Sequence, residues 1–164
     1  MYHSIKYYRG GVLVSIRFTK VNETNIDDIR KISVKENQTA FIETVDECLK
    51  GAEEYAGWCP VGIYNDDILV GFAMYGAFGK NPDAWIDRII IDRNYQGLGY
   101  GRASMEKLIK VVAKQYKVEK IYLSFVEGNE TGKTLYESLG FKYTGEKDPN
   151  GEFIYQLDLN HKNF

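Results

Sequence analysis

The sequence has few of the residues on which several common kinds of active site depend. Only two of its 164 residues are histidines, His3 and His161, and only two are cysteines, Cys48 and Cys59. Because both histidines lie near the ends of the chain, a catalytic triad or a metal site built on histidine is nearly excluded. The cysteines form no Cys-x-x-Cys pair, so we expect both to be packed as small apolar side chains.

Long apolar runs and an excess of positive charge are also missing. No stretch of about 18 or more apolar residues occurs, and the first residues lack the apolar core and cleavage site of a signal peptide. We therefore expect a cytoplasmic protein without a membrane partner. The formal net charge is −2, whereas proteins that bind nucleic acid usually present a basic surface, so no nucleic-acid partner is expected either.

The residues that are present describe an ordinary globular chain. Hydrophobic residues make up 44% and charged residues 27%, and the length suits one domain with a sizeable core. Residues 1–11 are rich in tyrosine and show no periodic pattern, so we expect a flexible lead followed by a single domain over 12–164. Between Lys20 and Pro60, nine acidic residues face five basic ones. This excess either covers solvated helix faces or attracts a cationic ligand.

Hydrophobic periodicity and turn residues predict alternating strands and helices. The expected strands cover 12–18, 60–64, 68–78, 84–91, 118–126, 141–146 and 152–159. One expected helix begins after Asn25, and three others cover 44–55, 99–116 and 131–139. The three strands between 60 and 91 follow one another as a meander. We therefore expect an α+β fold, a twisted mixed sheet with helices on both faces.

A glycine-rich segment, Gln96-Gly97-Leu98-Gly99-Tyr100-Gly101, joins a predicted strand to a predicted helix. Glycines allow several backbone N–H groups to point at one anion, and the helix N-terminus adds the positive end of its dipole. The segment therefore predicts a site for a pyrophosphate group that needs no metal ion.

Two other nucleotide-binding motifs are similar to parts of the sequence but do not match it. A dinucleotide fingerprint that began at Gly97 would need glycine or alanine in place of Arg102, and it would follow the first strand of a parallel unit. Residues 128–134 approach the P-loop pattern GxxxxGK[ST], but that pattern needs its first glycine at Glu127. Neither a dinucleotide enzyme nor a nucleotide hydrolase is therefore favoured.

Two motifs together resemble those of the Gcn5-related N-acetyltransferase (GNAT) family. Residues 96–101, Gln-x-x-Gly-x-Gly, are similar to its pyrophosphate signature Q/R-x-x-G-x-G/A. Residues 129–141, Asn-x-x-Gly-x-x-Leu-Tyr-x-x-x-Gly-Phe, are similar to its second motif, N-x-x-A/G-x-x-x-Y-x-x-x-G-F. The resemblance covers roughly residues 14–159. It implies the acyl-coenzyme A N-acyltransferase fold of that family.

Four more segments resemble the spermine/spermidine acetyltransferases of the family: ENQTAFIE at 36–43, PVGIY at 60–64, VGFAMYG at 70–76 and WIDRIIID at 85–92. This resemblance implies transfer of an acetyl group from acetyl-CoA to a primary amine of a polyamine such as spermine or spermidine, without a metal. Two alternatives stay open. One is a GNAT enzyme for another amine, such as a protein N-terminus, an aminoglycoside or an amino acid, and the other is a non-catalytic acyl-CoA sensor. Pairing into a homodimer also stays open.

The resemblance further implies roles for individual residues. Tyr136 would be the general acid, and Asp87 lies where the polyamine enzymes carry an acid near the incoming amine, although Asp87 could equally be a solvent-facing strand residue. The other residues implied in substrate binding are Glu36, Gln38 and Phe41. The residues implied in cofactor binding are Ile89, Ile90, Ile91, Gln96, Gly97, Leu98, Gly99, Tyr100, Gly101, Arg102, Asn129 and Gly132.

The chemistry of acetyl transfer to an amine explains why a phenol and a carboxylate suit these two catalytic positions. An alkylamine titrates near about 10.4, so it is mostly ammonium at neutral pH and must lose a proton before it attacks a thioester. The departing thiolate leaves more readily when it is protonated. A phenol with a pKa near about 10 keeps a proton to donate, and a carboxylate can attract the ammonium or take its proton.

Overall fold

The computed structural model describes residues 6–9, 12–80 and 83–159. The elements in chain order are β1 (Lys6–Arg9), β2 (Val12–Lys20), α1 (Ile26–Ile29), the 3-10 helix η1 (Glu36–Gln38), α2 (Val45–Glu54), β3 (Trp58–Asn65), β4 (Ile68–Phe78), β5 (Asp83–Ile91), α3 (Tyr100–Tyr116), β6 (Lys120–Phe125), α4 (Glu130–Ser138), β7 (Lys142–Lys147) and β8 (Phe153–Asp158). None of the helices in these described ranges is long and apolar enough to cross a bilayer.

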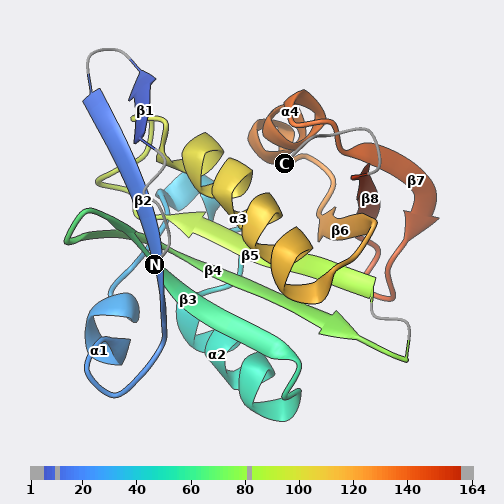
Figure 1. The fold of residues 1–164 in the computed structure, drawn as a ribbon, viewed down its shortest axis with the longest axis horizontal. Coiled ribbons are helices and arrows are strands. Elements are labelled where there is room, and N and C mark those ends of the chain that lie inside the picture. Colours follow the sequence, from blue (N-terminus) through green and yellow to red (C-terminus); the bar gives the residue numbers. More distant parts are fainter. Residues whose placement is uncertain (1–5, 10–11, 81–82, 160–164) are drawn as a thin grey trace.

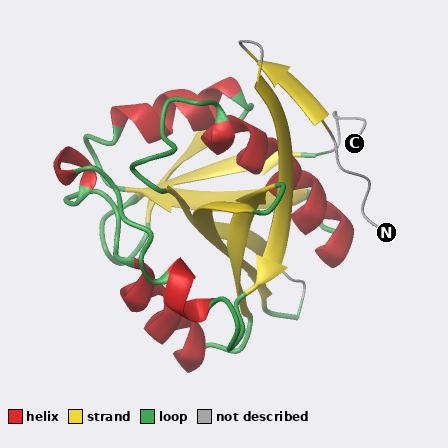
Figure 2. Ribbon diagram, turned by 90° about the vertical axis from the view of Figure 1, so that its left-hand side faces the viewer, coloured by secondary structure: helices red, strands yellow, loops and turns green. Residues whose placement is uncertain are grey.

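Eight strands form one sheet in the order β1-β2-β3-β4-β5-β6-β8-β7 (Figure 1). All neighbouring strands are antiparallel except β5 and β6, which are parallel. Figure 2 shows helices on both sides of this sheet. The mixed sheet with helices on both faces, expected from the sequence, is therefore confirmed.

The sheet separates two apolar cores, and β4 contributes to both of them. Phe72 and Met74 pack into the core that contains the buried residues of α1 and α2. Ala73 and Tyr75 pack into the larger core, which contains the buried face of α3. A strand that is buried on both faces has no polar side to show. This explains why residues 68–78 read as one continuous apolar run.

The structure adds detail to two expectations from the sequence. The helix expected after Asn25 begins there but is a single turn, and the Asn25 side chain accepts a hydrogen bond from the Asn22 backbone N–H at 2.8 Å instead of capping the helix. Within the lead expected to be flexible, Lys6–Arg9 form β1, which pairs with the edge of β2. Residues 1–5 and 10–11 of that lead lie outside the described residues.

The parallel strands β5 and β6 pair over only a short length. Their ladder joins Ala84 to Ile121 and Trp85 to Tyr122, although β5 continues to Ile91 and β6 to Phe125. On its other side β5 stays paired with β4, and this ladder has an irregularity at Asp87. The two central strands therefore diverge beyond Trp85 and open the middle of the sheet.

Candidate active site

A cavity of about 360 Å³ lies where β5 and β6 diverge. Its wall is assembled from the segment around η1, from β5, from the glycine-rich loop and from the start of α4. The lining residues are Val34, Asn37, Gln38, Phe41, Ile42, Ile89, Ile91, Tyr95, Gln96, Gly97, Tyr100, Gly101, Gly128, Asn129, Glu130, Thr131, Gly132, Leu135 and Tyr136.

The glycine-rich loop presents free backbone N–H groups to this cavity. Gly97 and Gly99 have φ angles of 79° and 88°, a left-handed conformation that glycine adopts without strain. Ala103 N–H makes the first α3 hydrogen bond, to Gly99 O, so the three preceding amides have no acceptor within the helix. These amides and the positive end of the α3 dipole suit an anionic group such as a pyrophosphate.

The segment around η1 is fastened to the end of β5 by side chains. The Gln96 side-chain amide donates to Ile91 O at 3.0 Å and to Gln38 Oε1 at 2.8 Å. The buried carboxylate of Asp92 accepts a hydrogen bond from Ser33 N–H at 3.1 Å. These contacts hold the segment against the cavity as one of its walls.

The Phe41 side chain extends from this wall to the loop between β6 and α4. A Cβ atom placed on Gly128 would lie 3.3 Å from the Phe41 ring, and Gly128 itself has a φ of 91°. The ring therefore lies close against the backbone of a residue on the far side of the cavity. Glycine at position 128 makes this close approach possible.

Asn129 and Gly132 shape the wall at the start of α4. The Asn129 side chain accepts a hydrogen bond from Gly132 N–H at 3.0 Å and so caps the helix. A Cβ atom on Gly132 would lie only 2.8 Å from Asn129 Nδ2. The Asn129 cap therefore needs glycine at position 132, which is the spacing of these two residues in the sequence motif.

Tyr136 lies on α4 between two aromatic rings. Its ring centroid is 5.5 Å from that of Phe125 and 6.3 Å from that of Phe141. Burial raises the pKa of the Tyr136 phenol to about 12, while Arg88 lowers the pKa and Glu152 raises it further. The phenol is therefore protonated at neutral pH, and both charges lie within electrostatic reach of it.

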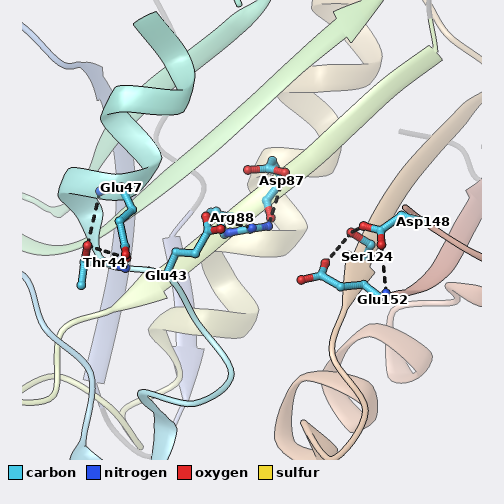
Figure 3. A network of polar contacts seen from close by, with 8 residues as sticks. All are labelled: Glu43, Thr44, Glu47, Asp87, Arg88, Ser124, Asp148 and Glu152. Carbon is cyan, nitrogen blue, oxygen red and sulfur yellow. Dashed lines mark hydrogen bonds and ion pairs between the residues drawn. The ribbon is translucent and has the colours of Figure 1, made fainter. Parts of the chain in front are cut away.

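Arg88 forms two ion pairs beside the point where β5 and β6 diverge (Figure 3). Its guanidinium lies 3.0 Å from Glu43 Oε2 and 3.3 Å from Asp87 Oδ1, and it also donates to Asp87 O at 2.8 Å. Burial raises the pKa of Asp87, Arg88 opposes that rise, and Glu43, Glu152 and Asp148 add to it. Asp87 is therefore a stronger proton acceptor than an ordinary aspartate.

Two further carboxylates come from the turn between β7 and β8. The Ser124 hydroxyl lies 2.8 Å from Glu152 Oε2 and 3.4 Å from Asp148 Oδ2 (Figure 3). We call the four carboxylates of Glu43, Asp87, Asp148 and Glu152 the acidic cluster. It adjoins the end of the cavity at which Tyr136 lies, because the charges of Arg88 and Glu152 act on the Tyr136 phenol.

The structure brings most of the residues predicted from the sequence to one place. Those that line the cavity are Gln38, Phe41, Ile89, Ile91, Gln96, Gly97, Tyr100, Gly101, Asn129, Gly132 and Tyr136. Asp87 lies in the acidic cluster instead, and Gly99 is the N-cap of α3.

Four more predicted site residues, besides Asp87 and Gly99, lie outside the cavity lining. Ile90 is buried in the core beside α1 and α2, so only its backbone can face the opening. Leu98 is half exposed, and Glu36 is exposed at the start of η1. The Arg102 guanidinium contacts Ser138 and lies 3.4 Å from Glu106, so it joins α3 to α4.

Several acids of the stretch between residues 20 and 60 form contacts within that stretch. Asp28 pairs with Lys31, Asp46 pairs with Arg30, and Glu47 caps α2. Glu43 is the acid of this stretch that joins Asp87 and Arg88. Of the other two acids of the cluster, Asp148 lies in the turn before β8, and Glu152 is the first residue of the strand expected over 152–159. Nothing in the sequence around Asp148-Pro149-Asn150-Gly151 indicates that these two acids face β6.

Comparison with known proteins agrees with this geometry. Residues 24–141 match the Acetyltransferase (GNAT) family. The spermine/spermidine N(1)-acetyltransferase of Bacillus subtilis (strain 168) is 40% identical over 152 residues, which is 89% of this chain and all of that protein.

Solved structures share the fold at low identity. The Vibrio cholerae spermidine N-acetyltransferase, solved with CoA and spermine, has a TM-score of 0.67 at 16% identity, covering 86% of this chain and 92% of that one. The PaiA N-acetyltransferase of Thermoplasma acidophilum, solved with coenzyme A, has a TM-score of 0.63 at 18% identity, covering 88% of this chain and 99% of that one. The family match and the Bacillus subtilis relative show that the chain belongs to the GNAT family of acetyltransferases, and the cavity between the diverging strands with its glycine-rich loop agrees with this.

Proposed function

We propose that this acetyltransferase uses acetyl-CoA to acetylate a primary amine of a polyamine such as spermine or spermidine. The observation that carries the proposal is the acidic cluster beside Tyr136, where Glu43 and Asp87 pair with the guanidinium of Arg88 and the carboxylates of Asp148 and Glu152 lie together on Ser124. Such a site favours an acceptor with several positive charges. The name of the Bacillus subtilis relative, a spermine/spermidine acetyltransferase, supports the same acceptor class.

The glycine-rich loop and the open edge of β5 fit acetyl-CoA. The amides of Tyr100, Gly101 and Arg102 would hold the pyrophosphate, because they have no acceptor within α3. Backbone groups of Ile89 and Ile91 would pair with the pantetheine arm, since β6 does not pair with this part of β5. When bound, acetyl-CoA supplies the acetyl group as a thioester.

Two residues of the chain handle the protons of the reaction. Asp87 takes the proton that the acceptor ammonium loses, and its raised pKa makes it a better base for this step. The freed amine nitrogen would then bond to the acetyl carbon as the carbon–sulfur bond breaks, and the second proton that this nitrogen loses would return to the Tyr136 oxygen after Tyr136 has protonated the sulfur. Tyr136 donates its proton to the departing sulfur, because its raised pKa keeps it protonated until that moment.

An acceptor screen with acetyl-CoA tests this function. We expect spermine and spermidine to have a higher kcat/KM than putrescine, lysine, aminoglycosides or peptides, and we expect salt to raise the KM for spermine by screening the acidic cluster. Equal kcat/KM for spermine and for an amine with a neutral tail would favour another acceptor. Absence of turnover with every amine would favour the acyl-CoA sensor. Cytoplasmic location and homodimer formation stay predictions.

A further inference from the structure

Arg88 is a cation that the chain itself holds inside the acidic cluster. Its guanidinium lies between two carboxylates from different elements, Glu43 before α2 and Asp87 on β5, at 3.0 Å and 3.3 Å. Only 18% of the Arg88 side chain is exposed, compared with 48% of the Arg30 side chain in its pair with Asp46. A positive group is thus already bound at the place where the acidic cluster would bind an ammonium group.

The opposite side of the acidic cluster has no such internal cation. Asp148 and Glu152 share the Ser124 hydroxyl, and within the described ranges neither carboxylate forms a salt bridge. Two carboxylates on one hydroxyl repel each other and gain from a nearby positive charge. The acidic cluster therefore has one side neutralised by Arg88 and one side that is not.

Arg88 has a second contact that a purely structural role would explain. Its guanidinium donates to Asp87 O at 2.8 Å, at the point where the ladder between β4 and β5 is irregular. The strand irregularity leaves this carbonyl in need of a donor. An informative substitution must therefore keep a donor at position 88 while it removes the charge.

We propose that Arg88 determines how many charges of the acceptor the site recognises. Its guanidinium occupies the position between Glu43 and Asp87 that an additional acceptor ammonium would take, and leaves the Asp148 and Glu152 side for the acceptor. The inference rests on the proposed polyamine acetyltransferase function. It adds that the wild-type site discriminates less between singly and multiply charged acceptors than the four carboxylates would without Arg88.

Arg88→Gln tests this proposal, because glutamine keeps an N–H donor for Asp87 O and removes the charge. The measurement is kcat/KM for spermine divided by kcat/KM for a monoamine of similar length. We expect this ratio to rise on the order of tenfold in Arg88→Gln and to fall more steeply with salt than in the wild type. Arg88→Lys keeps the charge and should leave the ratio near the wild-type value.

Arg30→Gln is the matched control, because its ion pair with Asp46 has the same 3.0 Å separation and involves none of the four carboxylates of the acidic cluster. Its ratio should equal that of the wild type. Glu43→Gln changes the charge in the opposite direction at an exposed side chain and should lower the ratio, which keeps the proposal testable if Arg88→Gln does not fold.

The outcomes separate the two proposals. If wild-type enzyme acetylates polyamines but Arg88→Gln lowers kcat/KM equally for every acceptor, Arg88 only supports the strand and the inference is wrong. An unchanged ratio in both Arg88→Gln and Glu43→Gln would also overturn it. If wild-type enzyme acetylates no polyamine, the proposed function itself fails, whatever the variants do.

Discussion

At the scale of single residues, burial sets the chemistry of Tyr136. The ring is packed between Phe125 and Phe141, and this burial raises the pKa of the phenol to about 12. The same packing limits how far the hydroxyl can move. A side chain that stays protonated and stays in place is suited to donate one proton to a departing sulfur.

Replacing Tyr136 with phenylalanine removes the hydroxyl and keeps the ring packing. We expect kcat to fall by roughly 10²–10⁴, the range for loss of a general acid, with little change in the affinity for acetyl-CoA. Single-turnover kinetics and calorimetry with CoA measure the two quantities separately. A Tyr136→Phe enzyme with a wild-type chemical step would make Tyr136 a packing residue only.

The raised pKa of Tyr136 also predicts the pH dependence of the reaction. The acid must be protonated to act, so a pKa of about 12 extends its working range upward in pH. The rate constant kcat/KM should therefore rise as the acceptor ammonium deprotonates and should not fall through ionisation of Tyr136 below about pH 10. An alkaline decline near pH 9 that disappears in Tyr136→Phe would show that the phenol ionises there, which would contradict its raised pKa but not its role as the acid.

The two cysteines should differ in reactivity towards thiol reagents. Cys48 is buried in the core beside α1 and α2, and burial raises the pKa of its thiol to about 12, although Arg88 opposes the rise. Cys59 is only partly buried. We expect a disulfide reagent to modify native Cys59 before Cys48, because the thiolate is the reactive form. Single Cys48→Ala and Cys59→Ala variants assign the two phases, and equal rates would contradict the burial of Cys48.

At the scale of elements, the first turn of α3 belongs both to the glycine-rich loop and to a regular helix. Gly101 belongs to α3, and a Cβ atom there would meet only Ile91 Cγ1, at 3.8 Å. Gly99 before it has a φ of 88°, which strains any residue with a side chain. The two glycines of the motif therefore serve different purposes: Gly101 faces the cavity, and Gly99 is needed for its backbone conformation.

This difference gives a matched pair of substitutions at position 101. Gly101→Ala should keep the fold and most of the affinity for CoA. Gly101→Glu should keep the fold and weaken CoA binding on the order of 100-fold, because it places a negative side chain beside the pyrophosphate amides. Calorimetry on both variants measures the effect. Unchanged affinity in folded Gly101→Glu would remove the loop from the cofactor site.

Most elements could be predicted from the sequence, because their signals are local. The apolar run of β4, the N-cap Thr44 of α2 and the glycines around α3 each depend on neighbours a few residues away. The position of β1 could not be predicted, since its pairing depends on the free edge of β2. The start of α1 after Asn25 could be predicted but its short length could not, because Ile26, Ile29 and Ile32 recur at helical spacing although the helix ends at Ile29.

The site could be predicted in part for the same reason. Motif spacing identified residues of the glycine-rich loop and residues of α4. Within each motif these residues lie close together in the sequence, and they line the cavity. The meeting of Glu43, Asp87 and Glu152 depends on three distant segments and on the divergence of β5 from β6. No periodicity within one segment reports such a meeting.

At the scale of the whole molecule, the cavity separates two parts of the sheet. Strands β1 to β5 lie on one side and β6, β8 and β7 on the other, joined in the sheet by two residue pairs. A ligand bound between β5 and α4 would contact both parts. Its binding energy therefore adds to the stability of the assembled molecule.

CoA at about 100 times its dissociation constant should raise the free energy of unfolding by about 2.7 kcal/mol. We expect hydrogen exchange to slow at the amides of residues 89–91 and 100–102, since these groups face the proposed ligand. Thermal unfolding and exchange measured with and without CoA check both effects. Gly101→Glu is the control: because its affinity should be about 100-fold weaker, the same CoA concentration should add only about 0.4 kcal/mol and give much weaker protection. Protection confined to other regions would place the cofactor elsewhere.

The short ladder between β5 and β6 also bears on the order in which the molecule assembles. Strand β3 pairs with β4 and β4 pairs with β5, each across a short connection, so these contacts close small loops and can form early. The two pairs between β5 and β6 need α3 to be in place first, because it connects these strands. We therefore expect the cavity to be completed late in folding and to be lost first when the protein unfolds, so that acetyl transfer ceases before most of the sheet has melted.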